Sequence, residues 1–143
     1  MKKGARSKME GTRSDLGKFP MSGPEGREKK VFSRLREADG IKMITGEATP
    51  ALMSVWCSND VIQFGSLKIL AGGPVPQQTE WDQHPGDACF YVLDGPVTFF
   101  TSDKQTFHVE KGDFFFLPEK TIYKIINYYG HTVKVLFMIA PEF

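Results

Sequence analysis

The stretch GDFFFLPEKTIYKIIN, residues 112–127, decides the fold class of this chain. Gly112 and Asp113 supply a tight turn into an apolar run. Pro118 ends that run, because proline has no N–H to donate to a sheet. A second apolar run begins at Tyr123 after a short polar loop. The stretch therefore predicts two short strands, 114–117 and 123–127.

The same organisation continues on both sides of this stretch. Short apolar runs alternate with breaks rich in Gly, Pro, Asp and Ser, and helix-period apolar patterns are nearly absent. We expect further strands at 41–44, 51–57, 62–71, 88–93, 97–101, 106–109 and 133–139. Many short strands with regular turn chemistry are typical of an all-β sandwich or barrel, and a jelly roll fits best.

The chain divides into three segments by composition. Residues 1–30 contain nine Lys/Arg against four Asp/Glu and few large apolar side chains, which predicts a disordered basic linker or an added expression segment. Residues 31–50 mix apolar and charged side chains, so we expect an extended segment that precedes the barrel. Residues 51–143 form the barrel, and residues 31–143 carry nine Lys/Arg against thirteen Asp/Glu.

Targeting and redox features are sparse. No run is long and apolar enough for a membrane span, and no secretory signal follows the N-terminus. Cys57 and Cys89 have no disulfide-framework spacing, which favours a reducing compartment. Cys89 lies in an apolar strand, where we expect a buried thiol.

Residues 86–95 and 112–127 together resemble the two signatures of the cupin family. In that family the first signature carries two histidines and a glutamate, and the second carries a third histidine. Here Ala88 stands at the glutamate position and Tyr123 at the position of the third histidine. The resemblance covers about residues 60–143 and implies a cupin-type double-stranded β-helix.

The upstream histidine pair of the first signature maps onto this chain in two ways. It falls on Asp82 and His84, or on Trp81 and Gln83 if the spacing is one residue longer. A transition-metal site needs three or more converging ligands, and this set is too small. We therefore expect no metal, no cofactor and no catalytic residues, and we expect His84, His108 and His131 to be ordinary surface side chains.

The string from residue 62 onward resembles, more narrowly, the C-terminal cupin of centromere protein C, an inner-kinetochore protein. The similar stretches are 64–70, 90–93, 112–118, 122–127 and 135–138. The resemblance implies a non-catalytic homodimer in the nucleus, at the centromere, that supports centromeric chromatin assembly. It also implies docking of a centromeric-histone loading factor or another kinetochore protein. Any DNA contact by the basic N-terminal arm is expected to be non-specific.

Strand alternation predicts where such a dimer would pack. If Ala88 and Tyr123 point inward, their alternate neighbours point outward. The predicted dimer interface is then made of Tyr91, Leu93, Ile126, Leu136 and Met138. A loop that holds Glu80, Trp81 and Asp82 is a weaker candidate for contact with a partner.

Two other functions fit a cupin with few ligands. One is an isomerase, lyase or dioxygenase that works with a reduced metal-ligand set, and the other is a non-catalytic binder of a small ligand. We expect Phe90, Phe116, Tyr123 and Phe137 to fill the interior. A cavity of roughly 300 Å³ or more would favour ligand binding instead.

Overall fold

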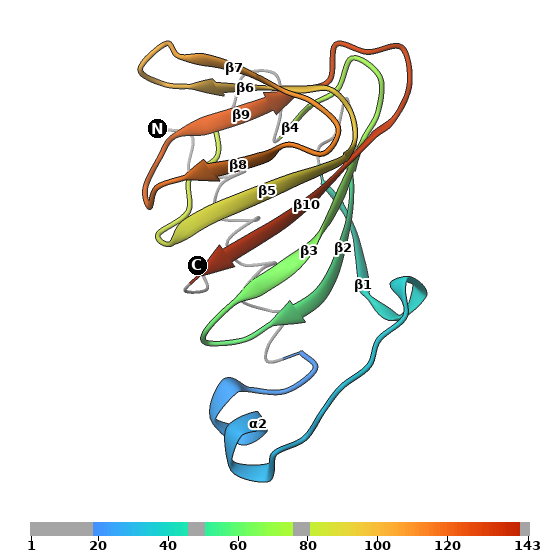
Figure 1. Ribbon diagram of the computed structural model, residues 1–143, viewed down its shortest axis with the longest axis vertical. Helices are drawn as coiled ribbons and strands as arrows, with labels where there is room; N and C mark the ends of the chain where they lie inside the picture. Colours follow the sequence, from blue (N-terminus) through green and yellow to red (C-terminus); the bar gives the residue numbers. More distant parts are fainter. Residues whose placement is uncertain (1–18, 46–50, 76–80, 141–143) are drawn as a thin grey trace.

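The computed structural model describes residues 19–45, 51–75 and 81–140, and it consists of two antiparallel sheets that face each other (Figure 1). The six-stranded sheet has the order β1-β2-β3-β10-β5-β8, and the four-stranded sheet has the order β4-β9-β6-β7. The strands are β1 (Ile41–Thr45), β2 (Ala51–Ser58), β3 (Gln63–Ile69), β4 (Pro74–Val75), β5 (Asp87–Asp94), β6 (Val97–Thr101), β7 (Thr106–Val109), β8 (Phe114–Leu117), β9 (Tyr123–Ile126) and β10 (Val133–Ala140).

The strand order is that of a jelly-roll barrel, which confirms the expected fold class. Consecutive strands often lie in different sheets, and the last strand, β10, is inserted between β3 and β5. All the strands expected from the sequence are present, with ends shifted by a few residues at most. The two-residue strand β4 was not anticipated, because Pro74 stands in a Gly- and Pro-rich break.

Alternation along the strands places the core as expected. Val133, Val135, Phe137 and Ile139 of β10 are buried, whereas the residues between them are partly exposed. The side chains expected to follow Ala88 and Tyr123 into the interior are all buried; these are Phe90, Val92, Ile125 and Asn127. The barrel is therefore closed around an apolar core shared by both sheets.

Asn127, which ends the second signature, joins the end of β3 to the β9–β10 loop. Its Nδ2 donates to the carbonyl oxygens of Ile69 (3.0 Å) and His131 (2.8 Å). Its Oδ1 accepts from the backbone N–H of Tyr129 (2.8 Å). A fully buried amide is stable only when such bonds satisfy it, so Asn127 has a structural role here.

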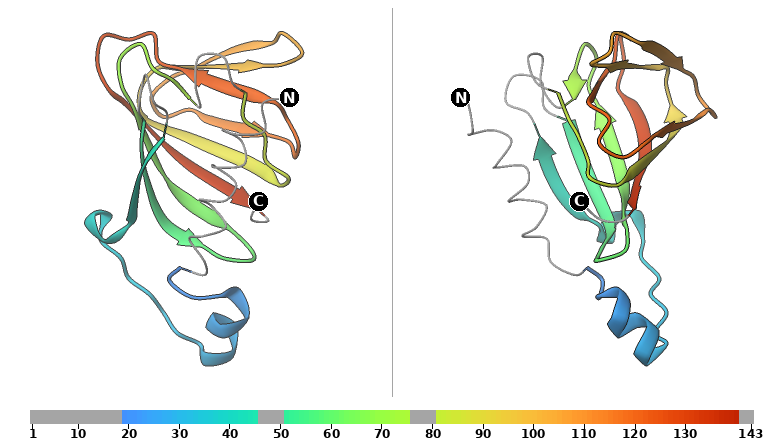
Figure 2. Two further views of the ribbon diagram at one scale, coloured as in Figure 1. Left: turned by 180° about the vertical axis from the view of Figure 1, so that it is seen from behind. Right: turned by 90° about the vertical axis from the view of Figure 1, so that its left-hand side faces the viewer.

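The N-terminal part of the described chain differs from the expectation of disorder over residues 1–30. Residues Gly23–Lys29 form a short helix, α2, which Ser22 caps by accepting from the N–H of Glu25. Gly23 N donates to Asp60 Oδ1 (2.8 Å), and this bond connects the helix to the β2–β3 turn. Figure 2 shows α2 beside the lower end of the sheet, joined to β1 by an extended segment. Residues 1–18 lie outside the described residues.

No helix among the described residues has the length and apolar character needed to cross a membrane.

Candidate functional site

The four positions that correspond to cupin metal ligands lie in the loop before β5, on β5 and on β9. His84, Ala88 and Tyr123 are all buried, and Asp82 is half-buried. Trp81 is partly exposed, and Gln83 bonds through Nε2 to the carbonyl oxygen of Lys120. The structure therefore favours Asp82 and His84, and not Trp81 and Gln83, as the counterparts of the upstream histidine pair.

His84 and Tyr123 contact each other directly. His84 Nε2 lies 2.8 Å from Tyr123 Oη, within hydrogen-bonding distance. The backbone fixes this contact, because Asp82 and Tyr123 exchange two N–H···O bonds of 2.7 and 3.0 Å. The carboxylate Oδ2 of Asp82 lies 3.5 Å from the same His84 nitrogen. The histidine is thus held between a phenol and a carboxylate.

Aromatic rings fill the space around this pair. The Phe90 ring lies 5.0 Å from that of Phe99 and 5.7 Å from that of Tyr123, measured between centroids. Phe99 also packs on Phe115, with centroids 4.5 Å apart. Tilted and edge-to-face contacts at these distances stabilise a core beyond the effect of burial alone. Tyr123 is therefore part of an apolar core that occupies this end of the barrel.

These residues do not fit the metal ion that the cupin fold commonly carries. Ala88 offers a methyl group where a carboxylate would be needed, and the polar atoms of His84 and Tyr123 are directed at each other. Within the described ranges, no three His, Cys, Asp or Glu side chains are grouped closely enough to hold a metal ion.

The three histidines do not share one environment. His108 and His131 are exposed, as expected, and His108 Nδ1 lies 3.0 Å from Thr98 Oγ1. His84 exposes only 3% of its surface, so its placement at the surface was wrong. The match of His84 to a ligand position of the first signature was the signal that indicated an inward side chain.

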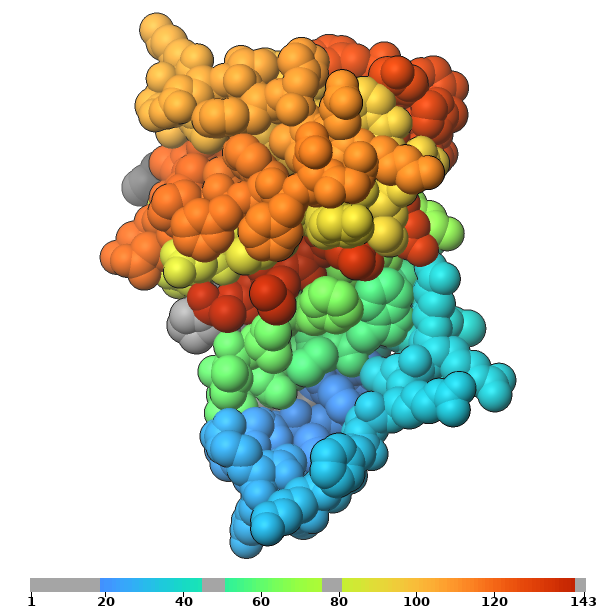
Figure 3. All heavy atoms as spheres, in the orientation of Figure 1, coloured from blue at the N-terminus to red at the C-terminus, as the bar shows by residue number. Residues whose placement is uncertain are grey.

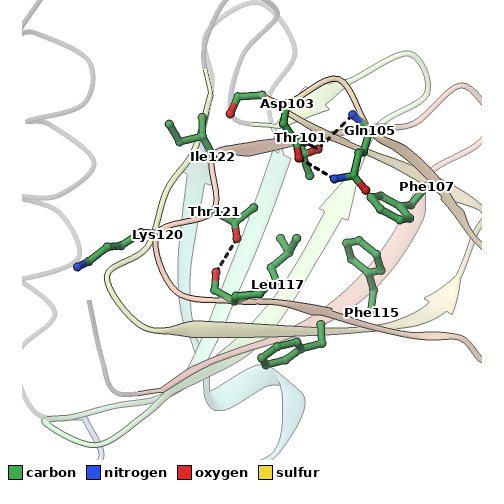
Figure 4. A pocket seen from close by; sticks show the side chains of 12 residues that line it. Thr101, Asp103, Gln105, Phe107, Phe115, Leu117, Lys120, Thr121 and Ile122 are labelled. Carbon is green, nitrogen blue, oxygen red and sulfur yellow. Dashed lines mark hydrogen bonds between the residues drawn. The ribbon is translucent and has the colours of Figure 1, made fainter.

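A separate pocket of about 540 Å³ opens between β7 and β8 (Figure 4). Phe107, Phe115 and Leu117 form its apolar wall, and Lys120 and Thr121 lie at its edge. The volume exceeds the roughly 300 Å³ that a small-ligand site needs. The pocket is lined on its inner side by Phe115, which packs on Phe99, so it lies beyond the ring cluster that fills the barrel.

A hydrogen-bonded group of polar side chains borders this pocket. Asp103 accepts bonds from Thr101 Oγ1 and from Gln105 Nε2 (2.6 Å). These bonds lower the pKa of Asp103, with the Thr101 bond as the largest cause. The Asp103 carboxylate is therefore hydrogen-bonded to residues of the same β6–β7 turn.

The outer surface of the six-stranded sheet carries two rows of side chains that are apolar except for Ser66. Cross-strand neighbours in one row are Phe64, Met138, Cys89 and Phe116, and in the next row they are Ser66, Leu136, Tyr91 and Phe114. We call these eight residues the outer apolar face. Figure 3 shows the strands that carry it as bands of orange, yellow, red and green across the visible side. Phe114, Phe116 and Tyr91 are each at least two-fifths exposed.

One edge of this sheet is held by the segment that precedes β1. The carbonyl oxygen of Glu37 accepts from Lys42 Nζ (2.9 Å) and from Trp56 Nε1 (3.2 Å). The Glu37 carboxylate pairs with Lys134, and this bond lowers the pKa of Glu37. The contacts of this segment thus lie near β2 and β10, and Tyr91, Phe114 and Phe116 stay exposed.

The predicted interface is divided between two sheets. Tyr91, Leu93, Leu136 and Met138 lie on β5 and β10, whereas Ile126 lies on β9 of the four-stranded sheet. Ile126 cannot share a face with the other four, because the two sheets turn their outer surfaces away from each other. Alternation gave the correct direction for each side chain but does not identify its sheet.

Phe116 was expected inside the barrel and is half exposed. The β5–β8 register explains the difference, since Ala88 faces Leu117, Phe90 faces Phe115, and Cys89 faces Phe116. Directly paired residues point to the same side of a sheet. Because residues 114–116 are all phenylalanine, their sequence shows no alternation that distinguishes inward from outward positions. The inward position of Ala88 together with this register identifies Phe115 as inward and Phe116 as outward.

The structure also bears on the predicted burial of Cys89 and on the predicted partner-contact loop. Cys89 is only half-buried, although burial and the nearby Asp87 raise the pKa of its thiol. In the predicted partner-contact loop, Trp81 is 38% exposed, whereas the Asp82 side chain is directed toward His84. Glu80 lies outside the described residues. Of this loop, Trp81 remains the candidate contact.

Comparison with known proteins places this fold among the cupins. Residues 71–139 match the family model for the cupin domain, and the structure has the cupin double-stranded β-helix. No curated protein sequence matches this chain significantly.

Several solved structures share the fold at low sequence identity. The Cnp3 cupin domain of Schizosaccharomyces pombe is 17% identical, with a TM-score of 0.58, and the match covers 70% of this chain and 69% of that one. A predicted oxalate decarboxylase from Thermotoga maritima is 18% identical, with a TM-score of 0.64 and coverage of 76% and 99%. The polyketide cyclase RemF from Streptomyces resistomycificus is 18% identical, with a TM-score of 0.63 and coverage of 78% and 81%. Proteins of this fold thus include enzymes.

Proposed function

We propose that this chain is a non-catalytic homodimerisation and protein-docking module of a centromere or kinetochore scaffold protein in the nucleus. The observation that carries the dimer proposal is the outer apolar face, which crosses the strands β3, β10, β5 and β8. Exposed aromatic side chains gathered in this way usually mark an interaction surface on a soluble protein. A second copy is the proposed occupant, because two-fold dimers are the commonest closed assemblies.

Two observations support a non-catalytic role. The positions of Ala88 and Tyr123 supply no carboxylate and no imidazole, and the surrounding rings fill the interior. The centromere assignment is supported by the resemblance of residues 62–143 to the C-terminal cupin of centromere protein C. A fold match to the Cnp3 cupin domain is compatible with it.

The dimer is tested by placing charges on the outer apolar face. The double variant Leu136→Glu/Met138→Glu alters the centre of the face, and Phe116→Glu alters an edge position that is half exposed. Burying an unpaired charge costs several kcal/mol, so both variants should be monomeric. Light scattering coupled to size exclusion measures the mass, and circular dichroism checks the fold. The matched control is Tyr129→Glu, an exposed aromatic side chain in the β9–β10 loop, which should remain dimeric.

The result that would reject this interface is a folded Phe116→Glu protein with the dimer mass. A wild-type protein that is monomeric at all concentrations would reject the dimer altogether. Because Phe116 lies on the edge strand β8, its variant should fold even if the double variant does not.

We propose non-catalytic binding of a small ligand as a second candidate function, since the pocket between β7 and β8 measures about 540 Å³. Its apolar wall of Phe107, Phe115 and Leu117 and its polar border suit an amphipathic molecule. Native mass spectrometry of the purified protein tests it. A bound molecule that is lost in Phe107→Glu would support this candidate, and an unliganded mass in every preparation would count against it.

A further inference from the structure

The outer surface of the four-stranded sheet carries a second pocket of about 540 Å³, on the opposite side of the barrel from the outer apolar face. Cross-strand pairing places Thr106, Phe100 and Lys124 side by side across β7, β6 and β9. Ile126 follows Lys124 on the same face of β9. We call this site, lined by Trp81, Phe100, Lys104, Lys124, Ile126 and Tyr128, the lysine–aromatic pocket.

Contacts within the site hold its aromatic side chains in place. Lys124 Nζ lies 4.5 Å from the centroid of the Trp81 ring, a cation–π contact. Tyr128 packs edge-on against Phe100, with centroids 6.4 Å apart. The backbone bonds between Asp82 and Tyr123 place Trp81 beside β9. The pocket is therefore built by the fold and does not depend on a single loop.

The charge of the site is supplied by lysine. Lys104 lies in the β6–β7 turn and is exposed, and Lys124 lies on β9. Asp103, next to Lys104 in sequence, accepts from Thr101 and Gln105, and Asp82, next to Trp81, lies beside His84. The pocket thus combines an aromatic floor with two ammonium groups.

We propose that the lysine–aromatic pocket binds an acidic peptide segment of a protein partner, with one apolar or aromatic side chain inserted between Phe100, Tyr128 and Trp81. Charge complementarity with Lys104 and Lys124 selects Asp and Glu on both sides of this anchor. The inference deepens the proposed docking role and rests on it, because it names the chemistry of the partner. A peptide is favoured over single-stranded nucleic acid, since the two lysines lie at one confined pocket, whereas a nucleic acid needs a basic groove that follows its backbone.

A peptide array tests the proposal directly. The probes are peptides of about ten residues with a central Leu, Phe or Trp flanked by Asp and Glu, together with versions flanked by Asn and Gln or by Lys. The whole chain is applied to the array, and the best binder is then titrated by fluorescence anisotropy. We expect binding of the acidic peptides alone, and it should weaken as salt is raised.

Charge-matched variants assign the binding to this pocket. Lys104→Glu/Lys124→Glu should weaken the affinity at least about tenfold, because like charges then oppose each other. Tyr128→Ala, at a residue that is 66% exposed, should weaken it without harming the fold. The control Lys68→Glu/Lys111→Glu changes the net charge equally at exposed positions outside the pocket and should bind normally.

The proposal is overturned if no acidic peptide binds, if neutral or lysine-flanked peptides bind equally well, or if the Lys104→Glu/Lys124→Glu protein keeps full affinity. It is also overturned if an oligothymidine competes for the site and binds more tightly than the peptides. Light scattering on the same samples separates this outcome from the dimer proposal. A dimer that binds no peptide rejects the pocket alone.

Discussion

Tyr123 shows how one residue changes the chemistry of a position. An imidazole there would present a nitrogen to a metal ion, whereas the phenol adds a ring to the core and directs its hydroxyl at His84. The histidine that remains is buried between Tyr123 and Asp82. A buried polar group is tolerated when it is hydrogen-bonded, so this pair now contributes to the stability of the barrel.

Tyr123→Phe should therefore destabilise the protein although it removes only one oxygen atom. The loss of the bond to His84 in a buried place is expected to lower the free energy of unfolding by about 1–3 kcal/mol. Urea unfolding followed by circular dichroism measures this change. Tyr128→Phe removes the same atom from an exposed side chain and should leave stability unchanged. Equal stability of the two variants would show that the His84–Tyr123 contact is not stabilising.

At the scale of the strands, the sequence predicts whether a side chain points inward or outward better than it predicts which strands are neighbours. Alternation around Ala88 gives the inward positions of Phe90 and Val92 correctly, because one strand fixes both. It fails for Phe116, since its direction depends on the register between β5 and β8, which are separated by two other strands in sequence. The match of His84 and Tyr123 to ligand positions of the two signatures implied that these residues, 39 positions apart, lie close together, but it did not indicate the direct hydrogen bond between them.

Gly65 marks a point where two strands and a core ring meet. A Cβ there would lie 2.2 Å from the carbonyl oxygen of Ser54 and 2.8 Å from the ring of Phe137. Gly65→Ala should force β2, β3 or Phe137 to move, at a cost of about 1–3 kcal/mol. Chemical denaturation measures the effect. Gly130→Ala is the control, because nothing lies within 4 Å of its Cβ position, and a Gly65→Ala protein as stable as this control would contradict the packing described.

At the scale of the molecule, the all-β class and its cupin form follow from the repeated turn chemistry and the two signatures, and the structure confirms both. The assignment of strands to sheets does not follow from them. Ile126 was grouped with Leu136 because both point outward, but they lie on different sheets. Only the three-dimensional pairing shows that the chain has two separate apolar surfaces.

If the outer apolar face joins two copies, thermal stability should depend on protein concentration. Association stabilises the folded state by mass action, so a hundredfold increase in concentration should raise Tm by about 3–6 °C. Differential scanning calorimetry at several concentrations measures this shift. The Phe116→Glu protein should show a constant Tm. A wild-type Tm that does not vary with concentration would contradict a reversible dimer.

The outer apolar face and the lysine–aromatic pocket lie on different sheets, and this placement determines where the pockets would lie in a dimer. Two copies joined through the six-stranded sheets would turn their lysine–aromatic pockets outward, away from the shared two-fold axis. One dimer could then hold two acidic segments at once, and a partner with two such segments would bind with avidity far above that of one segment. Such an assembly would act as a cross-linker, gathering partner molecules in pairs.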